Sequence, residues 1–341
     1  MKIAIHRRNG SFSDRWIEYC ENNRINFIIV NAYSNSIVQD LEGCIGFMWH
    51  WHHTDYKAHI LARQLTHTLE IKGIKIFPSL DTCWHFDDKI AQKYLFESLN
   101  LPYIKTEVFY DKKDAIKWVN ETTFPKVFKL KGGAGSSNVV LIKNKNDAIK
   151  KINIAFKRGF NLVERSSYFK RKLYNFKNDK TWKNFLKLNK GIYKYLFPNK
   201  ENYLLPVQKG YVYFQDFVDN NTYDTRTVTI GERTLGVRRY NRQNDFRASG
   251  SGKVRFTREL IDIEAVKLSF KIAKKLNSQS LACDFIYEND MLKIVEISYG
   301  IKAGLPSEDF MGYWDDSLNW YEGGFKVEYW MIEDFINSLK K

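Results

Sequence analysis

Residues 281–298 read LACDFIYENDMLKIVEIS, and this stretch decides the fold of the carboxyl-terminal half. Two apolar runs, Leu281–Tyr287 and Met291–Ile297, are separated by the turn residues Glu288–Asp290, and each run carries one carboxylate. The pattern predicts an antiparallel hairpin with Asp284 and Glu296 on adjacent strands. A carboxylate among apolar residues is costly unless it is paired or binds a metal, and oxygen ligands suit Mg²⁺. Pairing with lysine on the sheet is the alternative.

Three further strands and a helix are expected upstream of this hairpin. The strands cover 211–218, 223–230 and 234–240, a polar loop runs to about 256, and the helix covers 262–276. Strands clustered before a helix favour a mainly antiparallel sheet in an α+β layer. Arginines are frequent here, and arginine recognises carboxylate and phosphate groups through two hydrogen bonds at once. They are Arg226, Arg238, Arg239 and Arg247.

A glycine-rich loop precedes these strands, in the stretch PKVFKLKGGAGSSN at 125–138. It is flanked by predicted strands at 125–130 and 139–143, so it forms the turn of a hairpin. Its small residues let backbone N–H groups approach an anion closely, and two lysines supply positive charge. These residues are Lys129, Lys131, Gly132, Gly133, Gly135, Ser136 and Ser137. The loop does not lead into a helix, as nucleotide-binding loops of the Walker and dinucleotide types do, and a plain hairpin turn is the alternative.

The first 85 residues alternate strands and helices. We expect strands at 2–6, 26–30, 44–49 and 74–78, with helices at 12–23 and 56–72. This order predicts a small parallel sheet with helices on both faces, forming a first domain over 1–85. A further helix begins near Asp87 and ends at Leu101–Pro102, with Asp87 and Asp88 in the first turn, where the helix dipole favours acids. A strand at 106–110 and helices at 113–122 and from Asn146 onward follow.

The charge of the chain is concentrated in one segment. The 341 residues are 44% hydrophobic and 16% aromatic, which excludes a disordered chain, and the net charge is +15. Such a charge suggests binding to nucleic acid or to a membrane surface. However, the segment 157–200 holds 13 basic residues and two acids, so +11 lies there and +4 in the rest.

This basic segment also carries ten aromatic residues, a mixture that can bind phosphates and stack bases. The interpretation that we favour is an amphipathic helical insertion whose aromatic residues pack on the body and whose lysines are solvated. Nucleic-acid binding is the alternative.

Four cysteines, Cys20, Cys44, Cys83 and Cys283, match no zinc or redox spacing, so buried reduced thiols are expected. The chain has neither a signal-peptide core nor a run long enough to span a membrane, which predicts a cytoplasmic protein.

Together, these features resemble the ATP-grasp superfamily over about residues 85–300. The resemblance implies an α+β protein in which two α+β subdomains close on ATP, preceded by a small α/β pre-ATP-grasp domain. The expected divisions are 1–85 for the preceding domain, 86–210 for the small subdomain with the insertion at 157–200, and 211–341 for the large subdomain with the metal site.

The resemblance also implies roles for single residues. Lys89 and Lys129 correspond to the phosphate-binding lysines, and residues 132–138 to the glycine-rich flap. The hinge that reads adenine corresponds to Gln215, Asp216, Phe217 and Val218, and Asp224 to a ribose or substrate contact. Arg239 and Arg247 match arginines that hold the transferred phosphate, with Arg238 as an alternative to Arg239. Asp284 and Glu296 match the metal-binding acids.

The chain departs from the family at two positions. The family usually reads Glu-x-Asn at the second metal strand, whereas this chain reads Glu296-Ile297-Ser298. The hydroxyl of Ser298 is a weaker metal ligand than an amide oxygen, which bears on the number of Mg²⁺ ions bound. The Asp-Phe-Arg-x-Asn pattern of the ribosomal-protein glutamate-ligase branch becomes Asp245-Phe246-Arg247-Ala248-Ser249.

The function implied is ATP-dependent ligation of a carboxylate to an amine through an acyl phosphate. A small-molecule kinase is the alternative, because some members of the superfamily stop at phosphoryl transfer. The aromatic and acidic stretch 312–320 resembles the tails of ATP-grasp proteins associated with bacterial surface-polysaccharide synthesis. It suggests a sugar acid or its nucleotide conjugate as the carboxylate, and an amino acid or amino sugar as the amine. His50-Trp51-His52-His53, after a strand of the first domain, could line the substrate pocket.

Overall fold

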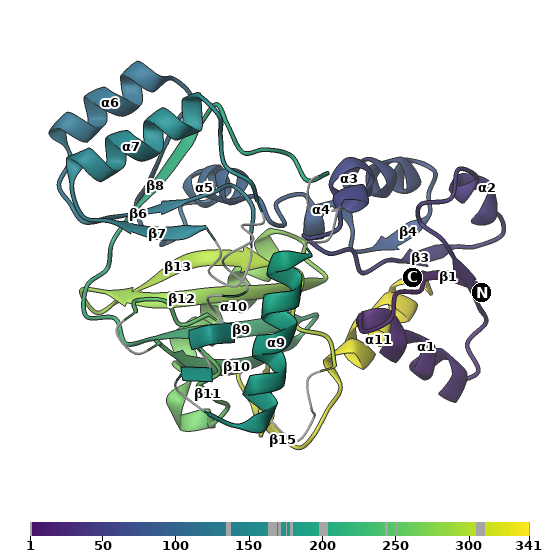
Figure 1. The fold of residues 1–341 in the computed structure, drawn as a ribbon. Helices are drawn as coiled ribbons and strands as arrows, with labels where there is room; N and C mark the ends of the chain where they lie inside the picture. The colour runs from purple at the N-terminus through teal and green to yellow at the C-terminus, as the bar shows by residue number, and fades with distance from the viewer. Residues whose placement is uncertain are drawn as a thin grey trace.

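The computed structural model describes residues 2–133, 138–162, 169, 172–174, 176–177, 180–197, 204–242, 245–249, 251–304 and 311–340. These residues form three sheets with helices packed on their faces (Figure 1).

The first sheet has four parallel strands in the order β2-β1-β3-β4. Its strands are β1 Ile3–His6, β2 Phe27–Val30, β3 Gly46–Met48 and β4 Lys75–Phe77. Neighbouring residues of a strand point to opposite faces. Ala4 therefore packs toward helix α3 (Tyr56–Ile71), whereas Ile3 and Ile5 pack toward α1 (Phe12–Asn22). The predicted parallel sheet with helices on both faces is confirmed. Two short helices, α2 (Ile37–Asp40) and α4 (Leu80–Cys83), lie in its connections.

The second sheet has four antiparallel strands in the order β5-β8-β6-β7. They are β5 Thr106–Phe109, β6 Lys126–Lys129, β7 Val139–Ile142 and β8 Val212–Asp216. Helices α6 (Lys112–Glu121) and α7 (Lys145–Phe156) cover this sheet, with Phe128 and Phe214 in the shared core (Figure 1). Strands β6 and β7 form the hairpin predicted around the glycine-rich loop.

The third sheet has seven strands, and their pairings are antiparallel, as predicted, although β11, β14 and β15 were not predicted. Its path is β13-β12-β9-β10-β14-β15, and β11 pairs with β10. The strands are β9 Tyr223–Ile230, β10 Arg233–Tyr240, β11 Val254–Arg255, β12 Ser280–Glu288, β13 Met291–Ser298, β14 Gly312–Asp315 and β15 Trp320–Glu322. Helices α5 (Lys89–Ser98) and α10 (Ile263–Lys275) share a core with this sheet, and the 3-10 turn η2 (Arg258–Leu260) precedes α10.

Two elements do not follow the domain divisions expected from the sequence. Strand β8 lies after residue 210 but belongs to the second sheet. Helix α11 (Val327–Ser338), which was not predicted, packs against α1 and buries Phe335 in the core that contains Ile3 and Ile5 (Figure 1). The carboxyl terminus of the chain therefore completes the first domain.

The basic segment contains helix α9 (Trp182–Leu196), which is amphipathic, as predicted. Its aromatic residues do not all pack on the body, because Trp182 and Tyr193 are exposed, so that part of the prediction is wrong. All four cysteines are free and buried. No helix among the described residues combines the length and apolar character needed to cross a membrane.

Candidate functional site

Charged residues form a row across three neighbouring strands of the large sheet. Glu296 on β13 lies opposite Asp284 on β12, and Asp284 lies opposite Arg226 on β9. Two residues before Arg226 on the same strand β9, Asp224 lies opposite Arg239 of β10. Because residues opposite each other in a ladder share a face, their side chains are brought together. The two predicted metal-binding acids are thus adjacent.

Asp284 is held by two arginines. Arg226 donates from Nε to Oδ1 (2.6 Å) and from Nη2 to Oδ2 (2.8 Å), and Arg239 Nη2 lies 2.7 Å from Oδ2. Burial by itself would raise the pKa of Asp284, but the two guanidinium groups outweigh it and hold the pKa well below its usual range. Arg239 also donates to both oxygens of Asp224, at 2.6 and 2.7 Å. Asp224, predicted as a ribose or substrate contact, is therefore engaged by arginine.

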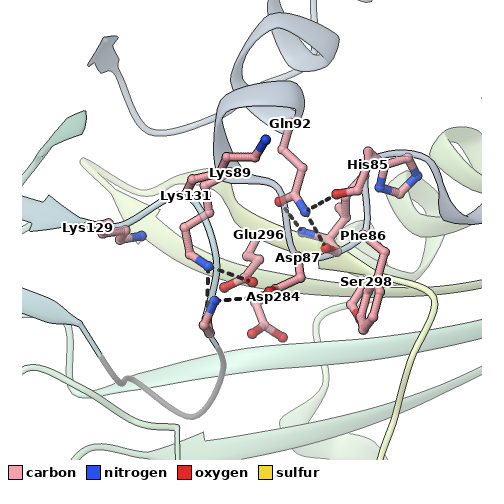
Figure 2. Close-up of polar contacts among 12 residues, drawn as sticks. His85, Phe86, Asp87, Lys89, Gln92, Lys129, Lys131, Asp284, Glu296 and Ser298 are labelled. Carbon is pink, nitrogen blue, oxygen red and sulfur yellow. Dashed lines mark hydrogen bonds and ion pairs between the residues drawn. The ribbon is translucent and has the colours of Figure 1, made fainter. Parts of the chain in front are cut away.

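The first residue of α5 reaches this row. Helix α5 begins at Lys89 because Asp88 caps it, accepting a hydrogen bond from the backbone N–H of Ala91. Lys89 Nζ donates to Glu296 Oε1 (3.2 Å) and to the carbonyl of Gly133 (3.1 Å). Burial lowers the pKa of Lys89, but the carboxylates of Glu296 and Asp87 reverse this effect and raise it. Lys89 thus stays charged between the glycine-rich loop and the predicted metal strand (Figure 2).

The start of the glycine-rich loop is clamped to the start of α5. The backbone N–H of Gly133 donates to Asp87 Oδ1 (2.7 Å), and the N–H of Lys89 donates to the carbonyl of Lys131 (2.9 Å). A Cβ at Gly132 would lie 2.7 Å from Asp87 Oδ2, so a side chain there would displace the Asp87 carboxylate. Burial raises the pKa of Asp87 to about 6, against the opposing effects of Lys89 and the Gly133 N–H. The side chain of Lys131 pairs with Asp88 (2.9 Å).

Lys129 lies on β6 and is buried beneath the same site. Its Nζ donates to Gln215 Oε1 (2.6 Å), and Gln215 Nε2 donates in turn to Thr106 Oγ1 (3.2 Å). Burial lowers the pKa of Lys129 to about 8, partly offset by the charges of Glu296 and Asp284 and reinforced by Lys89. The predicted phosphate lysines and metal-binding acids therefore sense one another's charge.

The predicted hinge follows β8. Asp216 pairs through its side chain with Lys126 (2.6 Å). The next residues, Phe217 and Val218, line an open pocket of ≈ 680 Å³ together with Tyr240 and Phe246. The hinge segment thus borders a hollow large enough for a ring system.

The remaining predicted residues lie at the edges of the site. Arg247 donates to Asp245 and to the carbonyl of Val139 (3.3 Å), at the strand that leaves the glycine-rich loop. Ser298 donates to the carbonyl of Gly300 (2.9 Å) and accepts from its N–H (3.0 Å), so its hydroxyl is engaged within its own turn. Gly135, Ser136 and Ser137 lie outside the described residues. Within the described ranges, no three His, Cys, Asp or Glu side chains converge as a preformed metal site.

For three residues of the site, the sequence patterns predicted no role. Arg226 could have been found from the spacing of Asp224 and Arg226, which places opposite charges on one face of a strand. Asp87 gave only a helix-start signal. Gln92 gave no signal, yet its side chain donates to the Ile297 carbonyl (2.8 Å) and accepts from the Ile297 N–H (3.1 Å), which fixes α5 against β13 beside Glu296.

A second polar cluster lies at the carboxyl edge of the first sheet, after β1 and β3. Arg8 is partly buried there, its Nε is enclosed without a hydrogen-bond partner, and it pairs with none of the described carboxylates. Its Nη2 lies 3.5 Å from His50 Nδ1, and burial and Arg8 lower the pKa of His50. The rings of His52 and His53 lie 4.0 Å apart, whereas a continuing strand would have separated them.

The fold is similar to that of several solved structures. The chain aligns with D-cycloserine synthetase DcsG at a TM-score of 0.60 and 11% identity, over 99% of this chain and 100% of that chain. It aligns with the ATP-grasp ligase PsnB, solved with its minimal precursor, Mg and ADP, at a TM-score of 0.56 and 10% identity, over 100% and 98% of the two chains. The fold is the ATP-grasp fold.

Another ligase has a similar ATP-grasp fold. D-alanine–D-alanine ligase from Bacillus anthracis aligns at a TM-score of 0.55 and 11% identity, over 89% of this chain and 88% of that chain. No protein-family model and no curated protein matches the sequence. At these identities the likeness concerns the ATP-grasp fold itself.

Proposed function

We propose that the protein is an ATP-dependent ligase that joins a carboxylate to an amine. The observation that carries this proposal is the grouping of two buried lysines, Lys89 and Lys129, with the opposed carboxylates Asp284 and Glu296 beneath a glycine-rich hairpin. Buried ammonium groups suit phosphate oxygens, and opposed carboxylates suit Mg²⁺. In phosphoryl transfer, such positioning and charge neutralisation supply most of the catalysis.

The donor chemistry fits ATP with Mg²⁺. Among the residues that the structure describes, Glu296 is engaged only through Oε1, by Lys89, which leaves Oε2 for a metal ion. Both oxygens of Asp284 accept from arginines, but a carboxylate oxygen can accept a second partner, so Asp284 would be a shared ligand. Ser298 would contribute its remaining lone pair. Bound Mg²⁺ would neutralise phosphate charge and orient the γ-phosphoryl group.

The side chains of this chain would then act on the reacting groups. Lys89 and Lys129 hold the phosphates, and Lys131 with Gly132 and Gly133 borders them. A carboxylate oxygen of the substrate forms a bond to the γ-phosphorus, and the bond to ADP breaks. Arg239 and Arg247 stabilise the charge of the resulting acyl phosphate. The amine then forms the amide bond at the acyl carbon, and phosphate leaves.

Substitution of Glu296 tests the reaction. We expect Glu296→Gln to abolish ADP release in the presence of carboxylate and amine without lowering thermal stability, because the neutral amide binds Mg²⁺ poorly. Glu288→Gln on the same hairpin, where the carboxylate lies 3.9 Å from Lys293, is the matched control. Near-normal turnover by Glu296→Gln would remove Glu296 from the metal site, and a stable phosphorylated product in place of an amide would indicate a kinase.

We further propose that Arg8 binds the anionic substrate, because its charge is unmatched among the described residues and its Nε lacks a partner. Arg8→Gln should raise the KM for the carboxylate by about tenfold or more, with a smaller effect on the KM for ATP, since a hydrogen bond between charged groups contributes about 1.5–3 kcal/mol. Arg7→Gln, an exposed neighbour, is the control. An unchanged carboxylate KM in Arg8→Gln would contradict this role.

The substrates proposed are a sugar acid or its nucleotide conjugate and an amino acid or amino sugar, in surface-polysaccharide synthesis. Support comes from the resemblance of residues 312–320 alone. An ADP-release screen across uronic acids, sugar nucleotides and amino acids, with mass analysis of the products, would identify the pair. Release only with substrates of other classes would discard the sugar assignment.

A further inference from the structure

Helix α9 presents an uncovered apolar face to solvent. Trp182, Tyr193 and Leu196 are 73%, 64% and 62% exposed, and Leu186 and Ile192 are also exposed. Residues of a helix turn by about 100° each, so these five side chains share one broad face, which also carries the exposed Asn189. Monomeric soluble proteins rarely leave a contiguous apolar patch of this kind without a partner.

The lysines of α9 occupy a separate face. Lys183, Lys187 and Lys190 follow one another by four and three residues, so they form a stripe along one side of the helix, and all three are exposed. The helix contains no acidic residue, and none of these lysines forms an ion pair with a described carboxylate. A stripe of unneutralised positive charge thus borders the apolar face.

The third side of α9 packs on other residues of the basic segment. Leu188 and Gly191 are buried, and Gly191 lies against Lys172 and Phe169. The rings of Phe176 and Phe185 contact each other at a tilted angle, with centroids 5.9 Å apart. The helix is therefore fixed through its narrow buried side, while its apolar face and lysine stripe stay outward. In Figure 1, α9 is drawn in front of the large sheet.

We propose that α9 binds the surface of an anionic membrane, lying in the plane of the interface. A helix with aromatic and aliphatic residues on one face and lysines on the adjoining face inserts its apolar side among acyl chains, while its lysines pair with anionic headgroups. Nucleic acid matches the arrangement of side chains on α9 less well than a membrane does. Leu186, Ile192 and Leu196 cannot stack on bases, and the lysines are segregated from the aromatic residues instead of interleaved with them. This proposal does not depend on the ligase activity.

Vesicle flotation with the full chain tests the proposal. We expect binding to vesicles of phosphatidylcholine and phosphatidylglycerol, weak binding to phosphatidylcholine alone, and a decrease as salt is raised. Lys183→Gln/Lys187→Gln/Lys190→Gln should reduce partitioning roughly a hundredfold, at about fivefold per lysine. Leu186→Ser/Leu196→Ser should reduce it as well, because apolar insertion is lost.

The chain offers matched controls for both variants. Lys267, Lys271 and Lys274 of α10 are exposed at the same spacing, and Ile60 and Ile71 of α3 are exposed apolar residues. Substituting these residues by glutamine and serine, respectively, should leave vesicle binding unchanged, and circular dichroism would verify folding of every variant. No vesicle binding by the unmodified chain, or equal losses in the control variants, would overturn the proposal. Lysine-dependent binding to a single-stranded oligonucleotide without vesicle binding would instead assign the surface to nucleic acid.

Discussion

At the scale of single residues, the partner of each buried lysine decides in which direction the lysine pKa shifts. Lys89 and Lys129 are both buried, but Lys89 donates directly to Glu296, whereas Lys129 donates to the neutral amide of Gln215. The pKa of Lys89 is therefore raised and that of Lys129 lowered to about 8. Two lysines with the same predicted role thus differ in their response to pH.

Nucleotide affinity should consequently depend on pH through Lys129. Above about pH 8 the unliganded chain loses the Lys129 proton, so binding that requires the ammonium should weaken by up to about tenfold per pH unit. In Lys129→Arg the guanidinium stays charged, and this pH dependence should disappear. Calorimetric titration with a non-hydrolysable ATP analogue at pH 7 and pH 9 measures the nucleotide affinity of the parental chain and of Lys129→Arg. Lys143→Arg, an exposed position, should keep the parental profile, and an identical profile for Lys129→Arg would contradict the assignment.

At the scale of elements, one glutamine fixes helix α5 to strand β13. Gln92 is buried, and its amide binds both backbone groups of Ile297 and the carbonyl of His85. These bonds align Lys89, at the start of the helix, with Glu296, one residue before Ile297. The geometry of the lysine and carboxylate pair therefore depends on a residue that touches neither of them.

Gln92→Leu should disturb both stability and the site. It leaves buried backbone groups of Ile297 without partners, so we expect a loss of about 2–4 kcal/mol in the free energy of unfolding. ATP turnover should fall as well, because Glu296 is no longer held in register with Lys89. Urea unfolding and ADP release measure the two effects. Ser98→Ala, an exposed position on the same helix, should change neither, and a stable, fully active Gln92→Leu would show that α5 docks without this contact.

At the scale of the whole molecule, the two ends of the chain share one core. Helix α11 packs beside α1 against the first sheet, and the same cluster includes Val228 and Ile230 of the large sheet. The first domain is thus joined to the ATP-grasp body by continuous apolar packing.

Phe335→Ala tests this shared core. Phe335 is buried, with its ring against Gly46 of β3. Its truncation should cost about 3–5 kcal/mol in the free energy of unfolding, since a cavity opens between α11 and the first sheet. Urea unfolding monitored by circular dichroism measures this cost. Ile71→Ala, which is 76% exposed, should change stability by less than about 0.5 kcal/mol. A similar small effect for Phe335→Ala would mean that α11 adds little to the core.

Much of the fold followed from local patterns. Most strands and longer helices of the first 300 residues, the parallel first sheet and the glycine hairpin were predicted because periodicity and turn residues act over short distances. The short elements α2, α4 and β11 were not predicted. Helix α11 was not predicted from the sequence. The placement of Asp284 and Glu296 on adjacent strands was predicted from the short turn between them.

The sequence by itself determined the element types, the faces that they bury, and the concentration of positive charge in one segment. Only the tertiary structure decided which charges meet. Arg226 and Arg239 hold Asp284, and Gln92 holds Ile297, because register and packing join residues far apart in the chain. Such pairings depend on how several elements assemble at once, and no local period in the sequence encodes them.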